Sequence, residues 1–558
     1  MHQNEFADCL KLFNSGDIKN ALIKGKNLIK KDPDNYELNK FLGLVLAHAN
    51  NFDEALLFFE KCLKINKNLP DIYFNLGLIY KKKGLLDISV KNYKRAIELN
   101  PNFADAYINL GVVFEQLERN EDCLAILEEL IKHDNNNYKA YYNLGNIFKK
   151  IDRLEDSIKA YQQAIKINDQ QAEIFFNLAI ALKKIGNYDE AILNYEKAIK
   201  LKPNYFKAYN NLGVIFNDQR KFSKAFNFFE TALKINPNFL EAYYNESFIF
   251  LLQNQFVEGW KRYEFRWTSE DQIKPLYNLN NNLWDGNFLD GTLLVWSEQG
   301  IGDHLFFGRM IQRIKDYAKN IIFSVDKRLL QLFKDFLLSL NINNIEVIEH
   351  NKNNLLSNFD KHIPAGSLGK FFANSDEEIL KFSTKSFFIN TQYKKIDDFL
   401  CKFSGPKIGL SWKSLNRNEK HRNIPLEKFI SIFINKNFNL INLQFGKTDE
   451  EIFKICQDFG VKINNFKDID NLNNINELSY LINSLDLVIT IQNTTAHLSL
   501  GFQKKTFVLL PTNSRWHWGV SGERTIWYPT AQIFRQSKYN HWEDVLNNVK
   551  ISLDKLFL

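Results

Sequence analysis

The sequence lacks the paired cysteines that build disulfide frameworks or zinc sites. Its five cysteines lie far apart along the chain, and none belongs to a CxxC pair: Cys9, Cys62, Cys123, Cys401 and Cys456. We therefore expect free thiols in a reducing compartment. We also expect no metal ion and no cofactor, since no clustered metal-ligand motif appears.

Long apolar runs and concentrated charge are also missing. No stretch of about 18 consecutive apolar residues occurs, so no membrane span is expected. The opening residues, MHQNEFADCL, lack the cationic and apolar regions of a secretory signal, and we expect a cytoplasmic protein. The formal net charge of +7 is small for 558 residues and is not gathered into a block. Bulk charge therefore gives no support to nucleic-acid binding.

What the sequence does contain is an internal repeat. A small residue recurs every 34 residues, at Gly43, Gly77, Gly111, Gly145, Ala179, Gly213 and Ser247. Aromatic residues stand four places before and three places after most of these positions, and another small residue stands twelve places after. Small residues let two antiparallel helices approach closely, while the aromatics fill the groove between neighbouring pairs. Prolines are expected to end the second helix of several units, at Pro33, Pro101, Pro203 and Pro237.

This spacing and residue pattern resembles the tetratricopeptide repeat family over residues 36–240, with a weaker unit on either side. The resemblance implies an all-helical superhelix over residues 1–273, with about eight units of which the first and last are degenerate. In such a stack each unit is stable only through its neighbours.

One column of the repeat is polar rather than apolar. Asparagine stands two places before each register position, at Asn75, Asn109, Asn143, Asn177, Asn211 and Asn245. A column at the repeat period lies along one face, which we take to be the inner one. An amide offers a donor and an acceptor, so it can pair with the backbone of a bound peptide whatever the peptide sequence. Alternatively, these asparagines cap helices or face solvent. The column is similar to the asparagine ladder of protein O-GlcNAc transferases.

The second half of the chain changes period. We place a linker at residues 274–290, with Trp284 docked on the protein. From residue 293 the apolar runs LLVWS, IIFSV and IEVIE alternate with helix-like segments, as in a parallel α/β sheet. After a break at CKFSGP, a second series follows, with KIGLSW, NLINLQF, LVITI and TFVLLP. We predict two Rossmann-like lobes, residues 291–402 and 403–558, which face a cleft.

The loop after the first strand run, SEQGIGD, carries two glycines and an aspartate. Gly300 and Gly302 are expected to permit a tight loop over the carboxyl end of the strand, where open α/β sheets bind ligands. The following helix is expected over residues 304–317. Asp303 at its start is either an N-cap or a carboxylate presented to the cleft as a general base. The loop is not a dinucleotide-binding fingerprint.

Three islands of the second half resemble the heptosyltransferase-like glycosyltransferases of family 9, especially those fused to tetratricopeptide repeats. The islands are WSEQGIGDHLFFGRM, IGLSWKSLNRNEKHRNIPLEKF and LVITIQNTTAHLSLGFQKKTFVLLP. The run RWHWGVSGERTIWYPTAQIFRQ resembles the tail of the repeat-fused subgroup. The similarity covers about residues 290–540.

The resemblance implies a GT-B fold and an inverting, metal-independent transfer from a nucleotide-activated sugar. Acceptor contacts would lie in the first lobe, with Asp303 as general base. Donor contacts would lie in the second lobe, at Lys413, Ser414, Arg422, Asn493, Thr494, Thr495 and His497. These types suit the chemistry, because a carboxylate can take the proton of an attacking hydroxyl. Cations, hydroxyls and a helix N-terminus can stabilise the departing diphosphate.

Each assignment has an alternative. Lys413 and Arg422 are otherwise surface cations, and His497 is otherwise a packed histidine with a backbone hydrogen bond. Arg515, Trp516 and Trp518 stack on a nucleobase or brace the last strand, and we favour bracing. We expect His304 and His421 to be surface or loop residues. The family usually has aspartate where this chain has Gln492, which removes a charge from the third island.

The leading hypothesis is a glycosyltransferase that moves a sugar from a nucleotide sugar to a polypeptide or glycan acceptor held by the repeats. The second hypothesis is an adaptor, in which the repeats bind a protein partner and the α/β half only senses nucleotide sugars or is inactive. A third places the chain in surface-polysaccharide or flagellin modification. The donor sugar and base are not specified by the sequence.

Overall fold

The computed structural model describes residues 2–268, 282–350, 359–414, 422–466 and 468–557. By its contacts the chain divides into two compact units, residues 1–208 and 209–558. The division falls inside the repeats, so the last repeat helices belong to the same unit as the α/β sheets. In the described residues, no helix is both long enough and apolar enough to cross a membrane.

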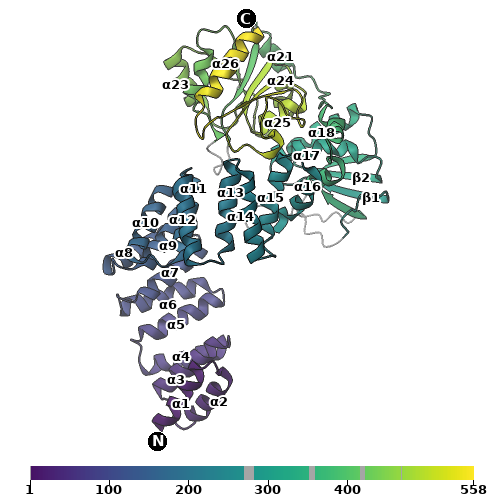
Figure 1. The fold of residues 1–558 in the computed structure, drawn as a ribbon. Coiled ribbons are helices and arrows are strands. Elements are labelled where there is room, and N and C mark those ends of the chain that lie inside the picture. The colour runs from purple at the N-terminus through teal and green to yellow at the C-terminus, as the bar shows by residue number, and fades with distance from the viewer. Residues whose placement is uncertain (1, 269–281, 351–358, 415–421, 467, 558) are drawn as a thin grey trace. The chain divides into compact units, whose positions relative to one another are not determined.

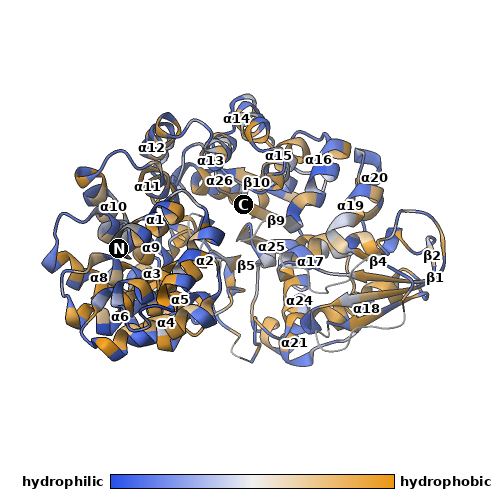
Figure 2. Cartoon of the chain, turned by 90° about the horizontal axis from the view of Figure 1, so that it is seen from below, coloured by the Kyte–Doolittle hydropathy of each residue, from blue (hydrophilic) through white to orange (hydrophobic). Residues whose placement is uncertain are grey.

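The first unit consists of helices paired in sequence order (Figure 1). The helices are α1 (His2–Asn14), α2 (Ile18–Ile29), α3 (Tyr36–His48), α4 (Phe52–Ile65), α5 (Pro70–Lys82), α6 (Leu86–Leu99), α7 (Ala104–Gln116), α8 (Asn120–His133), α9 (Tyr138–Lys150), α10 (Leu154–Ile167), α11 (Ala172–Lys184) and α12 (Tyr188–Leu201). Figure 2 shows orange and blue stretches on these helices, as amphipathic helices have. The predicted N-terminal all-helical repeat region is confirmed.

The repeat glycines allow close helix contact, as predicted. A Cβ atom at Gly43 would lie 2.7 Å from the ring of Phe59, and one at Gly77 would lie 2.6 Å from the ring of Tyr93. The small residues twelve places on add a hydrogen bond, because the hydroxyl of Ser89 donates to the carbonyl of Gly77 over 2.7 Å. The ring facing each glycine forms a buried column that the sequence analysis missed: Phe59, Tyr93, Tyr161 and Phe229, with Leu127 opposite Gly111.

The prolines follow the ends of second helices, also as predicted. Helix α6 ends at Leu99 and helix α12 at Leu201, each two residues before a proline. Proline lacks the N–H that the next helical turn needs, and it disfavours helical backbone in the residue before it. The 34-residue period therefore sets both the packing and the ends of these helices.

The second unit begins with the last repeat helices. These are α13 (Phe206–Asp218), α14 (Phe222–Ile235), α15 (Leu240–Leu252), α16 (Phe256–Tyr263) and the 3-10 helix η1 (Glu264–Thr268). The second helix of the final pair is short, in keeping with the degenerate last unit expected from the sequence. Trp284 is docked as predicted, since it is buried and its ring packs on those of Tyr317, Phe371 and Phe372.

Two separate parallel sheets follow. The first has the strand order β3-β2-β1-β4 and the second β10-β9-β8-β5-β6-β7. The strands are β1 (Leu289–Trp296), β2 (Ala318–Val325), β3 (Ile345–Glu349), β4 (Lys361–Pro364), β5 (Lys407–Ser411), β6 (Asn439–Asn442), β7 (Ile463–Asn464), β8 (Leu487–Ile491), β9 (Thr506–Leu510) and β10 (Ala531–Arg535). Every predicted apolar run forms a strand, and each strand pair is parallel. Strands β4, β7 and β10 were not predicted.

Helices and 3-10 turns connect the strands. They are α17 (Ile301–Gly308), η2 (Arg309–Arg313), η3 (Lys327–Leu329), α18 (Leu330–Ser339), η4 (Ala365–Leu368), α19 (Gly369–Phe372), α20 (Asp376–Ser383), α21 (Lys394–Leu400), α22 (Leu426–Ile430), η6 (Ser431–Phe433), α23 (Asp449–Phe459), α24 (Ile475–Asn483), α25 (Thr494–Gly501), η7 (Trp516–Trp518) and α26 (Glu543–Phe557). The helix expected over residues 304–317 begins earlier, at Ile301, and passes into 3-10 geometry at Arg309. That expectation was wrong in both bounds.

One hydrophobic core joins the last repeat pair to both sheets. It contains Trp260 of α16, Val295 of β1, Phe306 of α17 and Leu498 of α25. A second core lies on the other side of the second sheet and includes Ile408, Ile489 and Val545. The final repeat helices are therefore packed into the α/β region rather than appended to it.

Candidate functional site

The candidate residues gather at the carboxyl ends of strands where the strand order reverses. In the first sheet β1 lies between β2 and β4, and in the second sheet β5 lies between β6 and β8. Open α/β sheets bind ligands in the crevice outside such reversal points. Residues 297–303 follow β1, residues 412–414 follow β5, and residues 492–495 follow β8. The predicted site residues therefore fall where this topology binds ligands.

The two sheets meet through the helices α17 and α25, which lie side by side (Figure 1). A Cβ atom at Gly302 would lie 3.1 Å from Cδ2 of His497 and 3.8 Å from the hydroxyl of Thr494. Gly302 thus permits the close approach of the two helix starts. Gly300 has ordinary extended backbone, φ −91° and ψ 170°, and the left-handed residue of the loop is Gln299, with φ 67°. The loop therefore turns at Gln299 rather than at the predicted glycine.

Asp303 is the third residue of α17 and is not its N-cap, because Gly300 holds that position. Its carboxylate instead forms an ion pair with Nη1 of Arg515 at 2.9 Å. The backbone N–H of Arg515 in turn donates to the side-chain oxygen of Gln492 over 3.2 Å. Gln492 therefore helps to place the arginine that faces Asp303. The Asp303 side chain is 19% exposed, which leaves it accessible from solvent.

The start of α25 is organised by Asn493, its N-cap residue. The side-chain oxygen of Asn493 accepts from the backbone N–H of Ala496 over 3.2 Å, and its amide donates to the hydroxyl of Ser411 over 2.8 Å. Thr495 is buried and lies 3.5 Å from the same serine hydroxyl. Thr494 is half-buried, and its hydroxyl has no hydrogen-bond partner among the residues described. Asn493 and Thr495 therefore join β5 to α25, whereas the half-buried Thr494 has its hydroxyl close to Gly302 of α17.

The loop after β5 is partly engaged within the protein. The ammonium of Lys413 pairs with Glu451 of α23 at 2.6 Å, and the backbone N–H of Ser414 donates to Asn423 over 2.8 Å. Arg422 is 8% exposed and is therefore not a surface cation. His421 lies outside the described residues. Lys413 thus has a carboxylate partner already, whereas Arg422 is enclosed near the start of α25.

His497 is a packed histidine, but its partner is a side chain and not the backbone. Its Nδ1 lies 2.7 Å from the hydroxyl of Tyr528. Burial lowers the pKa of His497 to about 4, so the ring is neutral near pH 7. Burial likewise lowers the pKa of His304 to about 4 and the pKa of His517 well below the usual value. The expectation that His304 lies at the surface or in a loop was wrong, because it belongs to α17 and is 4% exposed.

The two tryptophans after Arg515 pack on buried aromatic rings, and their ring contacts are not with the last strand that we expected them to brace. Trp518 is fully buried and its ring stacks on that of Tyr528, while the Trp516 ring meets those of Trp260 and Phe306 edge-on. Arg309 is a buried cation beside these rings that the sequence analysis missed. Its guanidinium lies 5.0 Å from the centre of the Tyr528 ring and donates to the carbonyl of Trp527 over 3.2 Å. The sequence signal that could have predicted this buried cation is the arginine directly after the apolar run HLFFG.

The repeat asparagines already bond within the protein at several positions. The amides of Asn75, Asn109 and Asn177 donate to the carbonyl four residues earlier, over 2.7, 2.9 and 2.9 Å. The ammonium groups of Lys81 and Lys149 donate to Asn109 and Asn177, over 2.7 and 2.5 Å. Asn245 is buried and donates to Asn210 over 2.9 Å, whereas Asn143 and Asn211 are half-buried. Peptide binding by this column stays a prediction.

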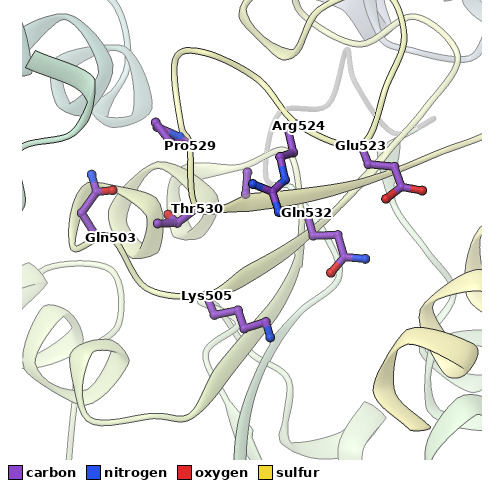
Figure 3. Close-up of a pocket in the computed structure, with 8 residues that line it drawn as sticks. Gln503, Lys505, Glu523, Arg524, Pro529, Thr530 and Gln532 are labelled. Atoms are coloured by element: carbon purple, nitrogen blue, oxygen red, sulfur yellow. The ribbon is translucent and has the colours of Figure 1, made fainter. Parts of the chain in front are cut away.

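A hollow of about 440 Å³ opens beside the amino ends of β9 and β10, and Figure 3 shows its lining side chains, which include Lys505 and Arg524. It lies at the opposite ends of the strands from the reversal points, so we do not take it as the candidate site. Within the described ranges, no group of His, Cys, Asp and Glu is arranged to hold a metal ion.

The repeat region consists of tetratricopeptide repeats. Residues 43–84, 86–118, 145–186 and 181–220 match the TPR repeat family model, and residues 206–239 match the tetratricopeptide repeat model. Repeats of this kind form extended concave surfaces that bind proteins or peptides, which suggests a role in protein interaction for this region.

The chain is also similar to individual proteins. It is 25% identical over 311 residues to Protein FlbA of Caulobacter vibrioides, across 53% of this chain and 52% of FlbA. It thus spans about half the length of this curated relative. Among solved structures it is similar to MamA, with 28% identity over 29% of this chain and 94% of MamA, at a TM-score of 0.28. It is similar to YrrB, described as a TPR protein with an unusual peptide-binding site, with 24% identity over 33% of this chain and 95% of YrrB, at a TM-score of 0.29.

Proposed function

We propose that this protein is a glycosyltransferase of the GT-B type. The two sheets would bind a nucleotide sugar between them, and the repeats would hold a polypeptide acceptor. The reaction is inverting and needs no metal ion. Five free cysteines, three of them buried, suit the reducing cytoplasm, where we place the protein.

The observation that carries this proposal is the position of Asp303. An accessible carboxylate lies where α17 of the first sheet contacts α25 of the second, and each helix follows a strand at a reversal point. A ligand bound across that contact meets Asp303 from one side and the start of α25 from the other. Carboxylates at the carboxyl ends of parallel strands serve catalysis rather than stability in many α/β enzymes.

The chemistry assigns one task to each group. Asp303 accepts the proton of the acceptor hydroxyl while its oxygen attacks the anomeric carbon of the sugar. The bond from that carbon to the diphosphate oxygen breaks, and the nucleoside diphosphate departs with the electron pair. Arg515, the hydroxyl of Thr494 and the backbone N–H groups at the start of α25 stabilise its charge. In the free protein, Arg515 forms an ion pair with Asp303.

The test has a binding step and a transfer step. The full chain is titrated calorimetrically with a panel of nucleotide sugars, and transfer to peptide is then followed by mass spectrometry. Asp303→Asn should lower the transfer rate by about 10²–10⁴-fold, the usual contribution of a general base, while donor affinity is retained. The matched control is Asp290→Asn, an exposed acid of the same sheet whose side chain is 80% exposed. Full activity of Asp303→Asn refutes the assignment of the base.

A second candidate function is an adaptor without transferase activity. The pairing of Lys413 with Glu451 favours it because this pairing reduces the positive charge available to a diphosphate, and Gln492 favours it because a glutamine lacks the carboxylate expected to recognise a sugar hydroxyl. In that case the repeats alone act, by binding a protein. Absence of binding to every donor, in protein with normal circular dichroism, would select the adaptor.

A further inference from the structure

The two charges of the candidate site are carried by two loops. Asp303 follows the loop of residues 297–300 between β1 and α17, which with Asp303 we call the Asp303 loop (residues 297–303). Arg515 lies in the segment after β9, which we call the Arg515 loop (residues 511–522). Both loops receive hydrogen bonds from the last repeat helices, which belong to the same compact unit.

The first set of contacts holds the Asp303 loop. Arg266 of η1 is 0% exposed, and its Nε donates to both carboxylate oxygens of Glu298, over 3.1 and 3.2 Å. Its other nitrogens donate to Glu264 and to the hydroxyl of Ser367, each over 2.8 Å. The next loop residue, Gln299, has left-handed backbone and donates to the hydroxyl of Tyr263 over 3.1 Å.

The second set of contacts holds the Arg515 loop. Arg220 lies in the turn between α13 and α14, and its Nε donates to the carbonyl of Thr512 over 3.0 Å. Its Nη1 donates to the carbonyl of Val520, and its Nη2 to the hydroxyl of Ser514 over 3.3 Å. One guanidinium from the repeats thus spans both ends of the loop that bears Arg515.

Arg535 of β10 also holds the Arg515 loop. Its Nε donates to the carbonyl of Gly522 over 3.2 Å, and its Nη1 to the hydroxyl of Ser514 over 3.4 Å. Two arginines, one from a repeat helix turn and one from a strand, therefore share a single serine. The loop is fixed relative to both elements at once.

Ordinary packing does not account for these contacts. Apolar contacts already join the last repeat helices to the α/β region, since Trp260 packs on Gly369 and the ring of Phe256 meets that of Trp527. A fully buried arginine–glutamate pair is no more stabilising than apolar residues of similar volume, because both charges lose their hydration. What such a pair does specify is geometry. Here the polar contacts from the repeats fall on the two loops that carry the site's charges.

We propose that residues 209–268 complete the site, and that Arg220, Tyr263 and Arg266 are positioning residues that fix the loops bearing Arg515 and Asp303. The catalytic meaning of this inference rests on the proposed glycosyltransferase function. Its structural content does not, since it concerns which contacts order the two loops. The last repeats thereby do more than hold an acceptor.

Hydrogen–deuterium exchange on the full chain tests the inference without any substrate. Arg220→Gln removes two of the three nitrogens with which Arg220 donates to the Arg515 loop. Exchange of peptides covering residues 511–522 should quicken at least about tenfold, which corresponds to roughly 1.4 kcal/mol of local opening. Arg220→Lys should restore part of the protection. The matched control is Lys221→Gln, the neighbouring exposed cation, whose ammonium bonds only to Gln219 in the residues described.

For the Asp303 loop, the double variant Arg266→Gln with Glu298→Gln removes both charges together, because a single change would leave a buried charge without its partner. Exchange over residues 297–303 should rise in it, with exchange over β8 and β9 unchanged. Unchanged exchange in either loop, or an equal rise across the strands of both sheets, overturns the inference.

A kinetic measurement separates positioning from acceptor binding. In a transfer assay Arg220→Gln should lower kcat and leave KM for the acceptor unchanged. The reverse pattern, a raised acceptor KM with normal kcat, contradicts positioning. If the unaltered protein transfers no sugar from any donor, the proposed function fails, and the exchange experiment still decides whether the repeats order the loops.

Discussion

Lowering the pH from 7 to 5 should destabilise the α/β region, by about 2 kcal/mol for each histidine whose pKa is lowered to about 4, because three of its histidines are buried in the neutral form. They are His304, His497 and His517, and all three are nearly inaccessible. Burial lowers the pKa of His304 and of His497 to about 4, and lowers that of His517 well below the usual value. A histidine in an unfolded chain has a pKa near 6.5.

The direction follows from these values. Since the folded-state pKa is depressed, the stability contribution of each histidine is fully present above pH 6.5 and is lost as the pH falls from 6.5 towards 4. At pH 5 the unfolded chain binds the proton and the folded one does not, which costs about 2 kcal/mol per histidine. The charges that face His497 are Asp303, which favours protonation, and Arg309, Arg422 and Arg515, which oppose it. Burial is the largest cause of the lowered pKa, and the three cations outweigh the one carboxylate, so the ring stays neutral.

Urea unfolding at pH 7, 6 and 5, followed by tryptophan emission, measures the effect. Trp518 lies against His497 and His517, so emission reports the surrounding core. The variant His497→Gln keeps a polar group towards Tyr528 but cannot be protonated. The difference in free energy of unfolding between this variant and the unaltered protein should therefore shrink by about 2 kcal/mol as the pH falls from 7 to 5. The two proteins should show parallel curves above pH 7. A constant difference at all pH values, or a His497 ring that titrates near pH 6.5 by NMR, refutes the reasoning.

Two further changes probe the start of each helix at the site. Gly302→Ala should lower the free energy of unfolding by about 1–3 kcal/mol in thermal unfolding, because the added Cβ meets His497. Gly300→Ala should change it by no more than about 0.5 kcal/mol, since the nearest neighbour of its Cβ would lie 3.8 Å away. Equal costs for the two variants would contradict the close approach of α17 and α25. Asn493→Ala should cost about 1–2 kcal/mol by urea unfolding, as the cap of α25 and the bond to Ser411 are lost together; an unchanged midpoint would show that Asn493 does not organise this turn.

The repeat period predicted the first half of the fold well, because local spacing determines which residues face each other. Gly77 and Tyr93 illustrate its limit. The repeating glycine was identified in the sequence, but the ring that packs against it stands sixteen places later and was not predicted. In the second half the apolar runs became strands. β7 has two residues, β4 ends in proline, and β10 carries polar residues among apolar ones, so none presented a continuous apolar run.

The sequence could predict which segments carry the candidate site, but not which side chains pair with one another there. Motif order placed Asp303 and Thr494 at strand ends, where the topology brings them together. Their partners come from distant segments: Arg515 stands 212 positions from Asp303, and Lys413 meets Glu451 across 38. Such pairings depend on how the sheets close against each other, and a single sequence carries no record of that. The burial of His304 was the more readable miss, because apolar residues follow it immediately.

The hydrophobic core that runs from Trp260 through Phe306 to Leu498 has a consequence for how the chain can be divided. A fragment that begins at residue 291 would expose one side of this core to water, so it should aggregate or stay partly unfolded. A fragment that begins at residue 209 keeps the core closed. The repeats before residue 209 can therefore be exchanged, by evolution or by design, for repeats that bind other partners. The two helix pairs after residue 209 must then stay with the two sheets.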